Sequence, residues 1–539
     1  MTIRAPALVL ALLLAAHPLA AQMDMGEHGG TPPAHLGRVR FPTSCSAAAQ
    51  QRVERAVALL HSFWYEEARK TFGEAAAHDS TCTIAYWGEA TSLLHPLWQP
   101  PTADDQRRGA ALVERARAAG PPTPREQGYV EAIGAFYHDW ATAGYLDRIK
   151  AWSAGLGRVH EAQPADTEAA IFYALSLIAV AQNSPPDTTY ALQRQAGDIL
   201  DPLFRVQPNH PGLAHYLIHA YDSPLLAHRA VRAADRYAGI APSVPHARHM
   251  PSHIYTRLGM WDASIASNTS SAAASRQYEA EQHMHTVWDQ RLHAMDYMAY
   301  AYLQEGRDAA ARRLAIETAG IKAWSPANSV AATYALAAIP ARYALERGRW
   351  GEAAALPVRS DLNEPASLAV THFARALGAA RGGDTAAARA ALTALAVIDS
   401  DFAQRRVPIW AGTVHAERLA AAAWLALAVH DTAAAVETAS DAADLEDHTE
   451  KHPVTPGAIL PARELYGDML LEVGRPADAL TAYEASLTRA PKRSRGLAGA
   501  IRAARMSGDH AAEQRLRQEY RALMVRADRE RRQLALERP

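Results

Sequence analysis

Glycines at expected turns between helices recur along most of this chain. Gly474 and Gly508 lie 34 residues apart, and Gly348 and Gly383 lie 35 apart. Other separations are larger and require longer helices or insertions. A sequence period in this range indicates stacked copies of one small structural unit. Abundant Ala, Leu, Arg and Glu favour helix, and no stretch sustains the apolar–polar alternation of a strand. The sequence therefore predicts an all-α repeat array without a sheet.

Composition and charge restrict the function classes. The chain has 539 residues, of which 49% are hydrophobic and 21% charged, so a wholly disordered protein is excluded. The formal net charge of −2 offers no sequence-wide basic surface, and we expect no nucleic-acid partner. The chain also lacks a G-x-S-x-G elbow, an H-E-x-x-H motif, a P-loop and a Rossmann glycine pattern. Any enzymatic activity would have to depend on a metal.

The segment EVGRPADALTAYEASLTRAP at 472–491 shows the repeat unit most clearly. It has a turn glycine, the small residue Ala479, then Tyr483, and Pro491 at the end of the second helix. This pattern resembles a tetratricopeptide repeat (TPR), and related signatures cover most of residues 45–530. The resemblance implies a TPR-like α-solenoid of stacked antiparallel helical hairpins, whose concave groove binds a peptide or protein ligand.

A narrower likeness lies in four segments: FPTSCSAAAQQRVERAVALLHSFWYEEARKTF at 41–72, CTIAYWGEA at 82–90, LLHPLW at 93–98 and HMPSHIYTRLGMW at 249–261. Together they resemble a group of exported bacterial TPR proteins, to which we attach no activity.

The N-terminus has the layout of a secretory signal peptide. Arg4 precedes an apolar stretch from Ala7 to Ala16, and small residues stand at Ala20 and Ala21. We expect cleavage after about Ala21, a periplasmic or secreted protein, and no membrane span in the mature chain. The expected organisation is a signal peptide at 1–21, a flexible Gly/Pro lead at 22–44, an N-terminal helical-repeat region at 45–206, a His-rich TPR-like region at 207–330, and C-terminal repeats with a capping helix at 331–539.

Cys45 and Cys82 are the only cysteines. In an oxidising compartment such a pair is most simply a disulfide. The alternative is a pair of metal thiolates, although nothing nearby has the C-x₂-C spacing of a thiolate site.

Histidines are concentrated in the middle of the chain. Ten of the 24 fall in the 84 residues from His210 to His293. They include two H-x₃-H pairs, His215 with His219 and His249 with His253, and this spacing puts both imidazoles of a pair on one helix face. The pairs are offset by 34 residues, one TPR period, so we expect the four imidazoles to converge.

The repeat register extends this set. His246 precedes His249 by three residues on the same stripe, and His293 and Asp296 match His246 and His249 in the next repeat. Asp222 continues the stripe beyond His219. In TPR arrays this stripe lines the concave groove, so the resemblance implies that these side chains face the groove and not the interhelix core. The candidate metal ligands are His215, His219, Asp222, His246, His249, His253, His293 and Asp296.

Imidazoles with one or two carboxylates suit Zn, Cu, Fe or Ni. The set predicts one metal with supporting histidines, or two metals. The plainer alternative is that these histidines cap and pack helices. Arg248 and Arg257 lie among them and are candidates to hold an anionic substrate or to cap the carboxylates.

Two functions follow from these patterns. One is an exported repeat protein whose histidine-lined groove binds a transition metal, a peptide or protein ligand, or both. The alternative is a metal-dependent enzyme, a hydrolase or oxidoreductase, that uses the cluster at 215–296 on a small-molecule substrate. The paired H-x₃-H motifs favour metal and leave catalysis open.

Overall fold

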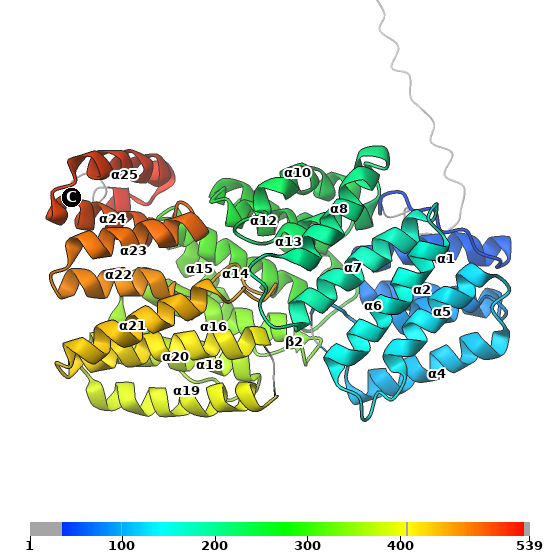
Figure 1. The fold of residues 1–539 in the computed structure, drawn as a ribbon, viewed down its shortest axis with the longest axis horizontal. Helices are drawn as coiled ribbons and strands as arrows, with labels where there is room; N and C mark the ends of the chain where they lie inside the picture. The colour runs from blue at the N-terminus through cyan, green and yellow to red at the C-terminus, as the bar shows by residue number, and fades with distance from the viewer. Residues whose placement is uncertain (1–34, 99, 406–407, 533–539) are drawn as a thin grey trace, which may run out of the picture. The chain divides into compact units, whose positions relative to one another are not determined.

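The computed structural model describes residues 35–98, 100–405 and 408–532, and the chain from His35 onward forms one compact unit. The fold is an all-α solenoid of antiparallel hairpins, in which each helix packs mainly against its neighbours in sequence. Figure 1 shows this most clearly for α19 to α25, which lie one above another. The expected TPR-like fold is confirmed. The expected region boundaries at 206 and 330 both fall within this unit.

Within the described ranges, the helices of the first part of the array are α1 (Ala47–His61), α2 (Tyr65–His78), α3 (Thr83–Ser92), α4 (Ala103–Ala119), α5 (Pro124–Tyr137), α6 (Tyr145–Ala162), α7 (Thr167–Asn183) and α8 (Ala191–Val206). The middle part contains α9 (Pro211–Tyr221), the 3₁₀ helix η1 (Ala227–Ala230), α10 (Val231–Ile240), α11 (Pro245–His249), α12 (Pro251–Arg257), α13 (Trp261–Glu281), α14 (Asp289–Gln304) and α15 (Asp308–Gly320). The last part contains α16 (Val330–Leu345), α17 (Trp350–Ala354), α18 (Pro365–Arg381), α19 (Thr385–Arg405), α20 (Pro408–Ala428), α21 (Thr432–Asp447), α22 (Ala462–Glu472), α23 (Pro476–Arg489), α24 (Ser494–Ser507), α25 (His510–Leu523) and η2 (Met524–Arg526).

The turn glycines explain where many of these helices end. The φ angle is +77° at Gly474 and +78° at Gly508, a left-handed conformation that glycine adopts without a Cβ clash. The other four turn glycines share it, namely Gly259, Gly306, Gly348 and Gly383. Short polar side chains start several helices; Asp431 accepts from the N–H of Ala434, and Asp509 from that of Ala512.

A two-stranded pairing departs from the expectation of no sheet. β1 (Val287–Trp288) and β2 (Trp324–Ser325) form a parallel pair. They lie in the connections before α14 and after α15, where residues outside the helices satisfy their backbone groups by pairing with each other.

The N-terminal lead is ordered where the structure describes it, contrary to the flexible segment expected at 22–44. Phe41 is fully buried, and its ring packs against those of Trp87 and Tyr129. Arg38 donates its backbone N–H to the carbonyl of Asn209. The free energy gained by burying an aromatic ring outweighs the flexibility that the local Gly and Pro residues would give. The expected signal peptide at 1–21, and the lead up to residue 34, lie outside the described residues.

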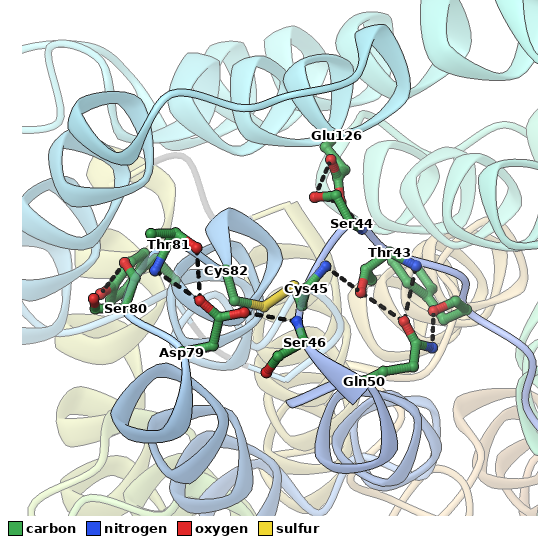
Figure 2. Close-up of a disulfide and its surroundings, with 12 residues drawn as sticks. Thr43, Ser44, Cys45, Ser46, Gln50, Asp79, Ser80, Thr81, Cys82 and Glu126 are labelled. Atoms are coloured by element: carbon green, nitrogen blue, oxygen red, sulfur yellow. Dashed lines mark hydrogen bonds between the residues drawn. A yellow bond between two sulfur atoms is a disulfide. The ribbon is translucent and has the colours of Figure 1, made fainter. Parts of the chain in front are cut away.

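Figure 2 shows a disulfide that joins Cys45 to Cys82, with a Cα–Cα distance of 4.8 Å. It ties the start of α1 to the start of α3. The Asp79 carboxylate accepts from the N–H of Ser46 at 2.7 Å and from the hydroxyl of Thr81 at 2.6 Å. The bond and these contacts fix the beginning of the array.

The C-terminal part of the array returns to contact the middle part. Arg493, before α24, donates to the Tyr300 hydroxyl of α14 at 2.7 Å and to Glu346 at 2.8 Å. The indole of Trp261 donates to the carbonyl of Lys492 at 2.9 Å. In α25, Leu516 is buried against its neighbours. The part of the predicted capping helix beyond residue 532 lies outside the described residues. None of the described helices is long and apolar enough to cross a membrane.

Candidate metal centre

Four helices carry the candidate histidines. His215 and His219 lie on consecutive turns of α9, which begins at Pro211 and is capped by His210. His246 and His249 lie on α11, and His253 lies on α12. Met250 lies between these two short helices and keeps helical angles of φ −53° and ψ −35°, so His249 and His253 still occupy successive turns. His293 lies on α14.

The structure brings the six predicted histidines together as two triads. The first triad is His215, His219 and His246, and the second is His249, His253 and His293. Within each triad, one potential ligand atom of every imidazole lies within 4.8 Å of the others. Each triad therefore combines an H-x₃-H pair with a histidine from further along the array, across α10 in the first triad and across α13 in the second.

In the first triad, ring nitrogens converge on His215. Its Nε2 lies 3.1 Å from Nε2 of His219 and 3.1 Å from Nε2 of His246. Its Nδ1 lies 2.6 Å from the carbonyl oxygen of His61. Because a carbonyl only accepts, Nδ1 of His215 carries the proton and Nε2 presents a lone pair. That single lone pair cannot accept well from both neighbours.

The second triad shows the same arrangement, and here hydrogen-bond partners fix the Nδ1 protons of two rings. Nε2 of His249 lies 3.0 Å from Nε2 of His253. Nδ1 of His249 donates to the side-chain oxygen of Asn268 at 2.6 Å, and Nδ1 of His253 donates to the Asp222 carboxylate at 2.8 Å. In the neutral rings both Nε2 atoms are therefore acceptors that face each other without a proton between them.

These separations suit a shared cation. Nitrogen ligands at about 2.0–2.1 Å from a tetrahedral metal lie about 3.3 Å from one another. Protonation is the other way to relieve facing lone pairs, but burial lowers the pKa of His249, with a further contribution from His253, and lowers the pKa of His253 although Asp222 opposes that shift. The buried rings thus favour a metal ion over a proton.

Asp222 contacts the second triad through Nδ1 of His253, on the opposite side of that ring from the facing Nε2 atoms. Burial opposes its ionisation, but Lys451 and Arg257 hold its pKa well below the usual range. Nζ of Lys451 lies 2.8 Å from Oδ2, and Nε of Arg257 lies 2.8 Å from Oδ1. With His253 also donating to it, this carboxylate orients a ligand. Arg257 thus takes the predicted role of capping a carboxylate, whereas Arg248 donates to the Pro242 carbonyl and to Ser270.

Asp296, the remaining candidate ligand, belongs to neither triad. It occupies the position in α14 that matches His249, but its Oδ1 accepts from Nε of Arg342 at 3.0 Å, and both side chains are fully buried. Arg342 also donates to the carbonyls of Gly457 and Ala458. An ion pair therefore occupies this position of the repeat.

The six histidines are buried, which differs from the expected open groove. Their relative exposures range from 0 to 8%. Two segments distant in sequence cover them: Phe63, after α1, packs its ring on His215 at a centroid distance of 4.4 Å, and Pro453 lines the small cavity at the triads. We call residues 449–461, between α21 and α22, the strap. Burial lowers the pKa of every one of the six imidazoles.

Sequence reasoning missed the residues that support and cover the triads. Phe63 has a φ of +53°, which is rare for a bulky residue and is held here by its packing. Gly212 lets α9 approach α1, since a Cβ there would lie 2.6 Å from Nδ1 of His61. Trp98 packs on His246 and His293. Lys451 lies 229 residues from Asp222. No spacing rule links these residues to the histidine motifs.

A third buried group, His61, Glu168 and His210, is a hydrogen-bonded network. Nε2 of His61 and Nε2 of His210 each donate to Glu168, at 2.7 and 2.8 Å. Nδ1 of His61 faces the Tyr216 hydroxyl at 3.0 Å. Although the three residues lie close enough to hold a metal, these ring nitrogens have partners. The network fixes His61, whose carbonyl orients His215.

A wide cavity of about 810 Å³ opens beside the triads. Trp98, Tyr145, Phe402 and Trp410 are among its lining residues. Trp98 also lines the small cavity at the triads. A small molecule or peptide segment in the wide cavity would therefore contact Trp98, which packs on His246 and His293.

No protein-family model matches the chain, and no curated protein matches it. Among solved structures, it is similar to a human IFIT1 dimer with PPP-AAAA, at 12% identity and a TM-score of 0.36, covering 90% of this chain and 92% of that one. It is also similar to yeast Tom70, at 11% identity and a TM-score of 0.34, covering 91% and 94%. Likenesses this distant carry no argument about function, and the solenoid assignment rests on the helices described above.

Proposed function

We propose that this chain is an exported metalloprotein that binds one transition-metal ion at each histidine triad. The observation that carries the proposal is the pair of facing Nε2 atoms in His249 and His253, whose Nδ1 protons are both donated elsewhere. Two acceptors buried at this separation are stable when a cation lies between them. The first triad repeats the arrangement around His215.

The ligand set narrows the choice of metal ion. Both triads consist of imidazoles alone, and Asp222 is already engaged by three donors. Imidazole ligands without thiolate or carboxylate suit zinc and copper, while a non-haem iron site ordinarily includes a carboxylate. We therefore place Zn and Cu ahead of Fe for both triads.

Export is supported by two features. The first 21 residues have the layout of a signal peptide, and a disulfide joins the only two cysteines. Both fit a periplasmic or secreted protein.

The alternative, a metal-dependent hydrolase or oxidoreductase, is favoured by the wide cavity. Because this cavity and the small cavity at the triads share Trp98, a small-molecule substrate bound there would lie beside the metal. A peptide or protein ligand would use the same space.

The test is the metal content of the purified protein after chelation and reloading with Zn²⁺ or Cu²⁺. We expect about one ion per triad in the unmodified protein, and loss of about one ion in either His215→Ala or His249→Ala. His372→Ala is the control, because His372 is a half-buried imidazole on α18 that belongs to neither triad. No bound metal in the folded protein, or equal loss in the control, would overturn the proposal.

A further inference from the structure

A small cavity lies between the two triads. Four of the six imidazoles line it, two from each triad: His219 and His246 from the first, His253 and His293 from the second. Its free volume is about 10 Å³, roughly the space of one water molecule.

The triads are adjacent across this cavity. The ring centroids of His219 and His253 lie 5.9 Å apart, and those of His246 and His249 lie 6.0 Å apart. Ring separations within the triads run from 4.2 Å, between His249 and His293, to 6.2 Å, between His253 and His293. The triads are therefore separated by little more than the rings of a single triad, which suits two metals that share a ligand.

We propose that the two triads form one coupled two-metal centre, in which a single exogenous oxygen ligand, a water or hydroxide, bridges the metals inside this cavity. The inference rests on the proposed function, since it requires an ion at each triad. Paired metals about 3.5–4 Å apart commonly share such an oxygen, and the shared charge makes it a hydroxide near neutral pH.

The bridge must come from outside the protein. Apart from the imidazoles, the lining described for this cavity is apolar or aromatic and includes Trp98, Met250 and Ala331. No carboxylate is among those lining residues. Asp222 lies on the far side of His253, bound to its Nδ1, and Asp296 is paired with Arg342. A bridging carboxylate, frequent in two-metal sites, is therefore replaced here by an open position.

This position also defines what the centre can act on. Its volume admits a ligand of one heavy atom, such as hydroxide or fluoride, while a larger substrate would approach from the Trp98 side, where the wide cavity begins. A small molecule held in the wide cavity would reach this position past Trp98, which lines both cavities.

The experiment loads the full mature chain with Cu²⁺ and compares copper content with electron paramagnetic resonance intensity. A bridging hydroxide couples the two Cu²⁺ spins, so we expect about two coppers per chain with less than about a tenth of the corresponding spin signal. Fluoride, which has one heavy atom, should displace hydroxide and change the optical spectrum with one fluoride per copper pair.

Ala331→Val tests the cavity without touching a ligand. Ala331 lines the cavity from α16, so an added pair of methyl groups should exclude the bridge and restore most of the spin signal at unchanged copper content. Ala335→Val is the control, since Ala335 is equally buried one turn further along the same helix and is not among the cavity-lining residues. Circular dichroism establishes that both variants are folded.

The outcomes separate the two proposals. Two coppers with the full spin signal, or only one copper per chain, would overturn the bridged centre and leave metal binding in place. Absence of both copper and zinc from the folded, reloaded protein would overturn the proposed function itself. A lost spin signal that Ala331→Val restores and Ala335→Val does not would support the bridge.

Discussion

Nε2 of His249 lies 3.0 Å from Nε2 of His253, while Asn268 and Asp222 accept the Nδ1 protons of the two rings. Partners behind a ligand determine where its proton lies and where its lone pair points. In this protein they direct both lone pairs toward the same point.

Asn268→Ala should weaken metal binding at the second triad. Asn268 is fully buried and its oxygen fixes the tautomer of His249, so we expect about a 10–100-fold loss of affinity at that triad. Competition with a coloured chelator measures it. Ser275→Ala is the control on the same helix, since Ser275 is buried and donates only to the carbonyl of Ser271. Unchanged affinity in Asn268→Ala would show that Asn268 does not orient a ligand.

The metal-free protein should lose stability as the pH falls below about 6.5. Burial, followed by the neighbouring imidazoles, holds the pKa of His249 below its ordinary value of 6.5. The unfolded chain therefore binds more protons than the folded one, and acid favours unfolding. Thermal unfolding from pH 8 to pH 5.5 measures the slope, which below pH 6.5 should be shallower by up to about 2.7 kcal/mol per pH unit in His249→Gln/His253→Gln, about 1.36 kcal/mol for each imidazole removed. Equal slopes in the two proteins would contradict this assignment.

Glu417→Gln should stabilise the protein at alkaline pH. Burial, with the neighbouring Glu446, raises the pKa of Glu417 to about 8. The neutral form is favoured in the fold, so its contribution is present at low pH and is lost as the pH rises through 8. We expect the variant to be about 2–4 kcal/mol more stable than the unmodified protein at pH 9, with little difference at pH 4. Denaturant unfolding measures this, and Glu437→Gln, at an exposed position, should show no such gain.

Asp296→Leu should destabilise the fold without removing a metal. It leaves the Arg342 guanidinium buried without its carboxylate, at a cost of about 3–5 kcal/mol. Adding Arg342→Met removes the unpaired buried charge and should restore part of the lost stability. Metal content should be the same in the double variant as in the unmodified protein. A loss of one ion from the folded double variant would identify Asp296 as a ligand.

Removal of the disulfide should lower the free energy of unfolding. Cys45 and Cys82 are 37 residues apart, and closing a loop of this length stabilises a fold by about 3–4 kcal/mol. We expect Cys45→Ser/Cys82→Ser to unfold at lower denaturant concentration with its metal content unchanged, because Cys45 precedes the start of α1 whereas His61, which contacts the first triad, ends that helix. A metal loss equal to that of His249→Ala would contradict the separation of the two features.

Much of the site was predictable from spacing. The 34-residue offset between the H-x₃-H pairs, and the register that added His246 and His293, correctly indicated six histidines that the fold brings together. The same register also placed Asp296 in the set. It could not show that an arginine from α16 takes that carboxylate, because the choice between a metal and an ion pair depends on the side chain across the helix interface.

The sequence by itself determined the repeat array, because turn glycines, capping residues and helix-favouring composition act locally. It also determined which face of each helix carries imidazoles, since helical spacing fixes that face. Only the tertiary structure decided that the histidines divide into two triads and are buried under Phe63 and the strap. It also decided that Asn268, Asp222 and Lys451 support them. Those contacts join residues up to 229 positions apart, and they exist only once the array brings distant repeats together.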